Sequence, residues 1–91
     1  MRDPLMTILF AGKTVLITGG SGFIGTRLVR RLLDLQAQVH VLVHPDADNS
    51  RLTAFSTQIM VHEIDIVRKN RVSQVMRDIR PDVVFHLAAA G

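Results

Sequence analysis

The 91-residue sequence contains no cysteine, no tryptophan and no tyrosine. Without cysteine there are no disulfides, no thiolate metal ligands and no cysteine nucleophile. Without tyrosine there is no phenol to serve as an acid or a base. Hydrophobic residues nevertheless make up 47% of the chain and charged residues 21%, a balance typical of a sequence that folds around a core. Since a typical domain has about 150 residues, the chain holds one compact unit at most.

Long apolar runs and a large excess of charge are also missing. No stretch approaches the roughly 18 apolar residues of a membrane-spanning helix, so we expect a soluble, cytoplasmic protein with no membrane partner. The 11 basic and 8 acidic side chains leave a net charge of +3, although the sequence pI is about 10.6. Because almost nothing titrates between the histidines and the lysines, this small excess persists to high pH and predicts no nucleic-acid partner. We expect residues 1–12 to form a disordered N-terminal arm and residues 13–91 to form the folded unit.

What the chain does contain is a regular alternation of β-rich runs and helical periods. Ile24, Leu28, Leu32 and Leu35 recur at helical spacing and predict an amphipathic helix. Residues 50–57 predict only a short, poorly defined helix. The strand-like runs are 14–18, 39–43, 59–61 and 83–87.

A third helix precedes the last strand-like run. Asn70 offers a helix N-cap, and Pro81 marks the stop. Apolar residues between them fall at i, i+3, i+4 and i+7, namely Val72, Val75, Met76 and Ile79. The predicted fold class is therefore α/β, a Rossmann-like doubly wound parallel sheet truncated after the fourth strand, with element order β-α-β-α-β-α-β. Right-handed crossovers place the strands in the order 3-2-1-4.

A glycine-rich segment, Thr18-Gly-Gly-Ser-Gly-Phe-Ile-Gly25, lies between the first strand and the first helix. Glycines at such a turn allow positive φ and let the backbone approach a pyrophosphate, which the free N–H groups of the helix then bind. Two spacings fit, one beginning at Gly20 and one at Gly19, and both share Gly22 and Gly25. An ordinary strand-to-helix turn is the alternative, and the flanking strand and amphipathic helix make it the weaker one.

The chain from Lys13 to Gly91 resembles the extended short-chain dehydrogenase/reductases, often named NAD-dependent epimerase/dehydratases. The resemblance rests on residues 18–25, on Asp65-Ile66 and on the stretch 80–89. It implies that Asp65 hydrogen-bonds the adenine amino group, that Ile66 lies against the ring, and that residues 87–89 line the crevice beside the phosphates and ribose. The implied cofactor-binding residues are Gly19, Gly22, Phe23, Ile24, Gly25, His44, Asp65, Ile66, Leu87, Ala88 and Ala89.

Simpler explanations exist for several of these polar residues. Asp65 could begin a loop with a merely solvated carboxylate, since aspartate is common where a strand gives way to a helix. His86, inside an apolar run, is best explained as a packing residue. His40 and His44 fall on one face of the same strand, but without a third ligand they predict no metal site.

The choice between NAD and NADP depends on the end of the second strand. NAD-specific relatives usually carry an acidic residue where this chain has Val43, which cannot accept the ribose hydroxyls. NADP-preferring relatives often carry arginine at the position of His44, and Arg51 could supply a second basic contact. Asp46 and Asp48 oppose this, because either could repel a 2′-phosphate or reach a ribose hydroxyl. On balance the sequence slightly favours NADP over NAD.

Function follows from the resemblance and from the missing tyrosine together. Relatives transfer hydride with a tyrosine acid/base, a lysine four residues later and a serine or threonine, all beyond the fourth strand. No catalytic residue is assigned here, and we expect no activity from these 91 residues alone. The main hypothesis is the NAD(P)-binding portion of an epimerase, dehydratase or reductase whose full-length parent is a homodimer. The alternatives are a stand-alone, redox-sensing dinucleotide binder and a domain for another phosphate ligand such as a flavin mononucleotide.

Overall fold

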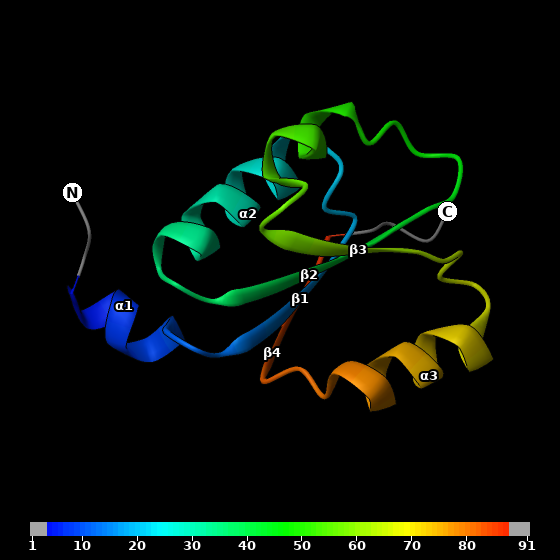
Figure 1. The fold of residues 1–91 in the computed structure, drawn as a ribbon. Coiled ribbons are helices and arrows are strands. Elements are labelled where there is room, and N and C mark those ends of the chain that lie inside the picture. Colours follow the sequence, from blue (N-terminus) through cyan, green and yellow to red (C-terminus); the bar gives the residue numbers. More distant parts are fainter. Residues whose placement is uncertain (1–3, 88–91) are drawn as a thin grey trace.

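The computed structural model describes residues 4–87, which form one parallel sheet with helices on both faces (Figure 1). The strand order is β3-β2-β1-β4, which confirms the predicted fold class and topology. The elements in chain order are α1 (Pro4–Phe10), β1 (Thr14–Thr18), α2 (Phe23–Asp34), β2 (Gln38–Val43), the 3-10 helix η1 (Ser50–Phe55), β3 (Ile59–Glu63), α3 (Lys69–Ile79) and β4 (Val83–His86).

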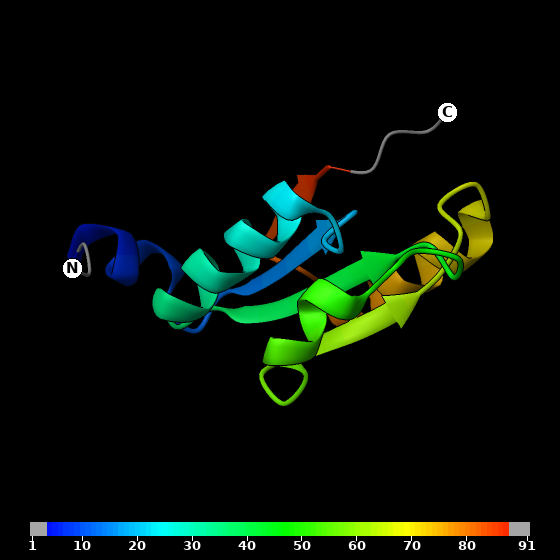
Figure 2. The same cartoon turned by 90° about the horizontal axis from the view of Figure 1, so that it is seen from above.

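Strand β1 lies at the centre of the sheet and fixes the register of its neighbours. Val15 stands opposite Val39 of β2 on one side and Val83 of β4 on the other. Strand β3 pairs with the outer side of β2, where Val39 stands opposite Ile59. All three pairings are parallel, so the carboxyl ends of the strands meet along one edge. The arrowheads of β1, β2 and β3 accordingly point the same way in Figure 2.

The two faces of the sheet are covered by different elements. Helices α2 and η1 lie above the sheet in Figure 1, and α3 lies below it. The side covered by α2 holds a large cluster of buried residues: Val15, Ile17, Val29, Leu32, Ala37, Val39, Val41, Val43, Leu52, Phe55 and Ile59. The side covered by α3 holds a small one: Leu16, Leu42 and Ile64.

Helix α3 begins earlier than its sequence pattern predicts. The N-cap is Arg68, which makes no side-chain cap, and Asn70 lies inside the first turn, so the predicted cap at Asn70 is wrong. A turn sets this start, because the N–H of Arg68 bonds the carbonyl of Asp65 at 3.0 Å. The helix ends at Ile79 before Pro81, as predicted.

The segment 4–10 forms a short helix where the sequence predicted no regular element. Phe10 packs against the large core cluster, and the N–H of Gly12 bonds the carbonyl of Gln36 at 3.0 Å. Leu5, Ile8 and Leu9 remain exposed. Within residues 4–87, no helix is long and apolar enough to cross a bilayer.

Candidate functional site: the carboxyl edge of the sheet

The glycine-rich loop leaves the end of β1 and turns directly into α2. Gly19 has φ of +75°, a left-handed conformation that favours glycine. A Cβ on Gly25 would lie 2.6 Å from the Cα of Gly20, and a Cβ on Gly20 would lie 2.3 Å from Cγ1 of Val41. The helix therefore packs against its own loop at Gly25, whereas the close approach to a strand is made by Gly20.

Gly22 differs from these glycines because the protein itself does not require it. A Cβ there would meet nothing within 4 Å, and its backbone (φ −77°, ψ 177°) is extended. The open space in front of Gly22 lies at the start of α2, where it is the N-cap. An absent side chain at this position keeps the helix end accessible to a ligand.

The first turn of α2 has backbone donors that no carbonyl of the helix accepts. The N–H of Thr26 is the first to bond a carbonyl one turn back, that of Gly22 at 2.9 Å, and the hydroxyl of Thr26 bonds the same carbonyl at 2.7 Å. The N–H groups before Thr26 have no intrahelical partner, as at any helix start. No acidic side chain occupies this turn, and Phe23 and Ile24 are exposed. Free donors and the positive end of the helix dipole together suit an anionic group.

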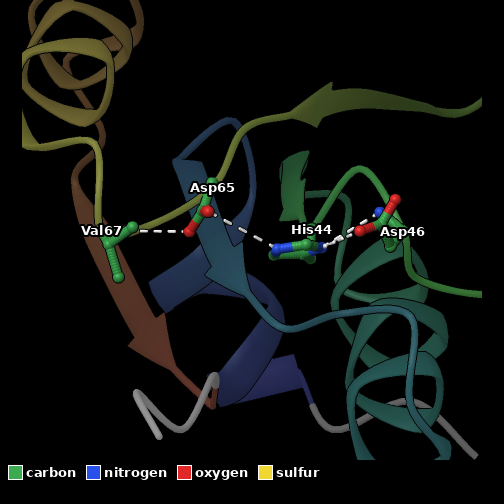
Figure 3. A network of polar contacts seen from close by, with 4 residues as sticks. All are labelled: His44, Asp46, Asp65 and Val67. Carbon is green, nitrogen blue, oxygen red and sulfur yellow. Dashed lines mark hydrogen bonds and ion pairs between the residues drawn. The ribbon is translucent and has the colours of Figure 1, made fainter.

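A second part of the site is a polar network that joins two loops of the same edge (Figure 3). His44 follows β2, and its ring lies between two carboxylates. Nε2 of His44 lies 3.6 Å from Oδ2 of Asp65, and Nδ1 lies 3.9 Å from Oδ2 of Asp46. The structure thus brings together two predicted site residues, His44 and Asp65, that are 21 positions apart in the sequence.

Asp65 is held by its own loop as well as by His44. Its Oδ1 accepts the N–H of Val67 at 3.1 Å, an Asx turn that fixes the carboxylate at the edge of the sheet. The turn agrees with the alternative that Asp65 begins a loop, and the contact with His44 shows that its carboxylate is more than solvated. The next residue, Ile66, packs against the small core cluster on the α3 side.

The end of β4 closes the edge on the other side of β1. The hydroxyl of Thr18 and Nδ1 of His86 are hydrogen-bonded at 2.7 Å, so His86 has a structural partner on the neighbouring strand. The N–H of Leu87 bonds the carbonyl of Thr18 at 3.0 Å and places Leu87 beside the glycine-rich loop. The predicted site residues Ala88 and Ala89 lie outside the described residues.

A contact that the sequence did not predict joins two histidines of neighbouring strands. His40 stacks on His62 of β3, with ring centroids 5.4 Å apart and Nδ1 3.1 Å from Nε2 of His62. Burial lowers the pKa of both imidazoles, and for His40 the nearby His62 lowers the pKa further. Within residues 4–87, no three His, Asp or Glu side chains gather as a metal site.

Arginines line a shallow groove that begins at the glycine-rich loop and was not predicted. The guanidinium carbons of Arg27 and Arg51 lie 5.6 and 5.9 Å from the centre of the Phe23 ring. Arg30 lies in the same way 5.7 Å from the ring of Phe55. The groove has a volume of about 530 Å³ and is lined by Phe23, Thr26, Arg27, Arg30, Arg31, Asp34 and Arg51. Its sequence signals were the charged side chains that share the polar face of the helix, Arg27, Arg30, Arg31 and Asp34, and the basic residue Arg51.

Comparison with known proteins supplies the family. Residues 15–91 match the NAD dependent epimerase/dehydratase family. The chain belongs to this family. Among its relatives is a UDP-glucose 4-epimerase of Azospirillum brasilense, 34% identical over 80 residues. Another is a dTDP-glucose 4,6-dehydratase of Neisseria meningitidis, 30% identical over 82 residues.

Solved structures of epimerases share the fold of this epimerase/dehydratase family member. An epimerase from Methanothermobacter thermautotrophicus superposes with a TM-score of 0.80 at 31% identity, over 93% of this chain and 25% of that one. The UDP-glucose 4-epimerase of Thermus thermophilus, solved in complex with NAD, gives a TM-score of 0.73 at 32% identity, over 86% of this chain and 24% of that one.

The alignments cover most of this chain but less than a quarter of each relative. The two curated relatives align with 88% and 85% of this chain, but the chain spans only 22% and 23% of their lengths. Their complete activities therefore involve far more protein than these 91 residues.

Proposed function

We propose that the chain is the NAD(P)-binding portion of an NAD(P)-dependent epimerase, dehydratase or reductase. The observation that carries this proposal is the start of α2, where N–H groups without an intrahelical partner follow Gly22 and a side chain at Gly22 would meet only open space. This helix start lies at the carboxyl edge of the parallel sheet, between β2 and β4, where such sheets bind nucleotides.

The residues of this edge fit the pyrophosphate and the adenosine part of such a cofactor. The N–H groups of Phe23, Ile24 and Gly25 would hold the pyrophosphate, with Gly19 and Gly22 giving the backbone its approach. Asp65, fixed by its Asx turn, would accept the adenine amino group, and Ile66 would lie near the ring. Leu87, with Ala88 and Ala89, would border the phosphates and ribose.

We further propose that NADP is preferred slightly over NAD. Val43 is buried, with 1% of its surface exposed, and has no group that could accept ribose hydroxyls. Arg51 contacts the ring of Phe23, which places a guanidinium next to the glycine-rich loop, and His44 is available as a second, weaker base. The carboxylates of Asp46 and Asp48 oppose a 2′-phosphate, which keeps the preference small.

A bound nicotinamide would supply the hydride acceptor or donor of the reaction. The chain's own part is to bind and orient the dinucleotide, because it contains no tyrosine that could move the proton. Activity is therefore assigned to the parent protein rather than to these residues. The cytoplasmic location and the homodimeric parent expected from the sequence belong to the same proposal.

The test is fluorescence titration of the purified chain with NADPH and NADH. Both should bind, NADPH the more tightly, and Gly22→Ala should weaken both at least about tenfold, because a methyl group would enter the space that the pyrophosphate needs. Ser73→Thr, which adds one methyl at an exposed position of α3, is the matched control and should bind normally. Absence of binding, or equal binding by Gly22→Ala, would overturn the assignment, and tighter binding of NADH would overturn the NADP preference.

A further inference from the structure

His44 is the one described side chain that touches acidic groups from both loops beside the adenosine end of the proposed site (Figure 3). Asp46 belongs to the loop between β2 and η1, and Asp65 to the loop between β3 and α3. The side chain of His44 is half exposed, as is typical of a group that can exchange protons with solvent.

The hydrogen bonds define which nitrogen carries the proton of the neutral ring. The backbone N–H of Asp46 donates to Nδ1 of His44 at 3.0 Å, so Nδ1 has no proton of its own. The proton of the neutral ring is therefore on Nε2, which faces Asp65. A second proton would be added at Nδ1, replacing the bond from the Asp46 N–H with an ion pair to the Asp46 carboxylate, now 3.9 Å away.

The charge of this cluster depends on that second proton. With a neutral imidazole the cluster carries the two negative charges of Asp46 and Asp65, and protonation reduces them to one. In the same loop, the N–H of Ser50 holds the pKa of Asp48 below its usual value.

We propose that protonation of His44 sets how strongly the site prefers NADP to NAD, so that the preference for NADP increases as the pH falls. This inference rests on the proposed function, because it places the ribose of the dinucleotide beside His44. Protonation of His44 lowers the net negative charge that faces a 2′-phosphate from two to one, which weakens the repulsion. The ribose hydroxyl of NAD carries no charge, so its binding changes much less.

The 2′-phosphate itself complicates a simple pH series. A phosphate monoester takes up a proton near pH 6, which weakens its attraction to any cation. The response of His44 must therefore be separated from that of the ligand. His44→Arg keeps a positive charge at every pH used, and His44→Gln keeps none, so both report the ligand's own titration.

The experiment is calorimetric titration of the 91-residue chain with oxidised NADP and with oxidised NAD at about pH 8 and about pH 6. The NADP preference is the dissociation constant for NAD divided by that for NADP. When the preference of the wild-type chain is divided by that of His44→Arg at the same pH, the result should be about two- to fivefold larger at the lower pH. His44→Gln should change in parallel with His44→Arg. His62→Gln removes the histidine of β3 that stacks on His40, and it should keep the wild-type response.

The outcomes separate this inference from the proposed function. In one outcome both nucleotides bind, but the wild-type NADP preference changes with pH as much as that of His44→Arg, or falls relative to it at the lower pH. In that case His44 does not set the preference, and only this inference fails. If neither nucleotide binds at either pH, the proposed function fails, and the inference fails with it.

Discussion

The two faces of the sheet are built from similar patterns but buried to different degrees. Helix α2 has Gly25, Val29 and Leu32 buried, whereas α3, equally amphipathic, has no buried residue. The difference arises from what lies on either side: η1 contributes Leu52 and Phe55 to the α2 face, whereas within residues 4–87 α3 is the one helix on the other face and leaves apolar side chains such as Val84 exposed. An amphipathic pattern therefore predicts a helix and its inner face, but the neighbouring elements decide how much stability that face contributes.

Matched deletions on the two helices test this comparison with the largest expected effect. Val29→Ala in α2 should lower the free energy of unfolding by about 2 kcal/mol, because two buried methyl groups are lost and a cavity remains. Val75→Ala in α3, where the same side chain is half-buried, should cost about half as much or less. Urea unfolding followed by circular dichroism measures both. Equal losses would show that the two faces contribute alike.

A substitution in the arginine-lined groove on the α2 face should have a smaller effect, on NADPH affinity. Arg51→Gln should reduce NADPH affinity about two- to fivefold and leave NADH affinity unchanged, because only the 2′-phosphate interacts with the lost charge. Arg31→Gln removes an arginine from the same groove, farther along α2, and is the control. If both variants lose NADPH affinity equally, the arginines act through their general field and Arg51 has no specific role.

The stacked histidines on the α3 side should make the free energy of unfolding sensitive to acid. This effect should be the smallest of the three. Since burial lowers the pKa of His40 and His62 in the folded state, the unfolded chain binds protons more readily, and stability should fall as the pH drops below about 6.5. The loss should level off below the lowered folded-state pKa values. Thermal unfolding between about pH 8 and about pH 5, compared with the double variant His40→Gln/His62→Gln, isolates their part. An identical pH profile in the double variant would contradict this assignment.

The parts of the fold that were predicted correctly depend on local patterns. Strand β1, its glycine-rich loop and α2 follow one another within residues 14–34, and each has a distinct composition. The end of α3 was predicted because Pro81 cannot continue a helix. Its start was not, because a backbone turn at Asp65 begins the helix before Asn70 can cap it.

The contacts that were missed all join distant parts of the chain. His40 meets His62 because β2 and β3 pair in a register that places His40 opposite Met60, the residue two before His62. His44 meets Asp65 because two parallel strands end at the same edge, and Arg51 meets Phe23 because η1 lies beside α2. Such contacts depend on register and on loop geometry, which composition and periodicity do not specify.

The most direct test of dinucleotide binding is amide chemical-shift mapping by NMR as NADP is added to the chain. The largest shifts should occur at Phe23, Ile24 and Gly25, followed by His44 and Asp65, while the amides of α3 beyond its first turn should change little. Shifts centred on α3, or no shifts at saturating NADP, would contradict the assignment of the glycine-rich loop and the start of α2 as the cofactor site.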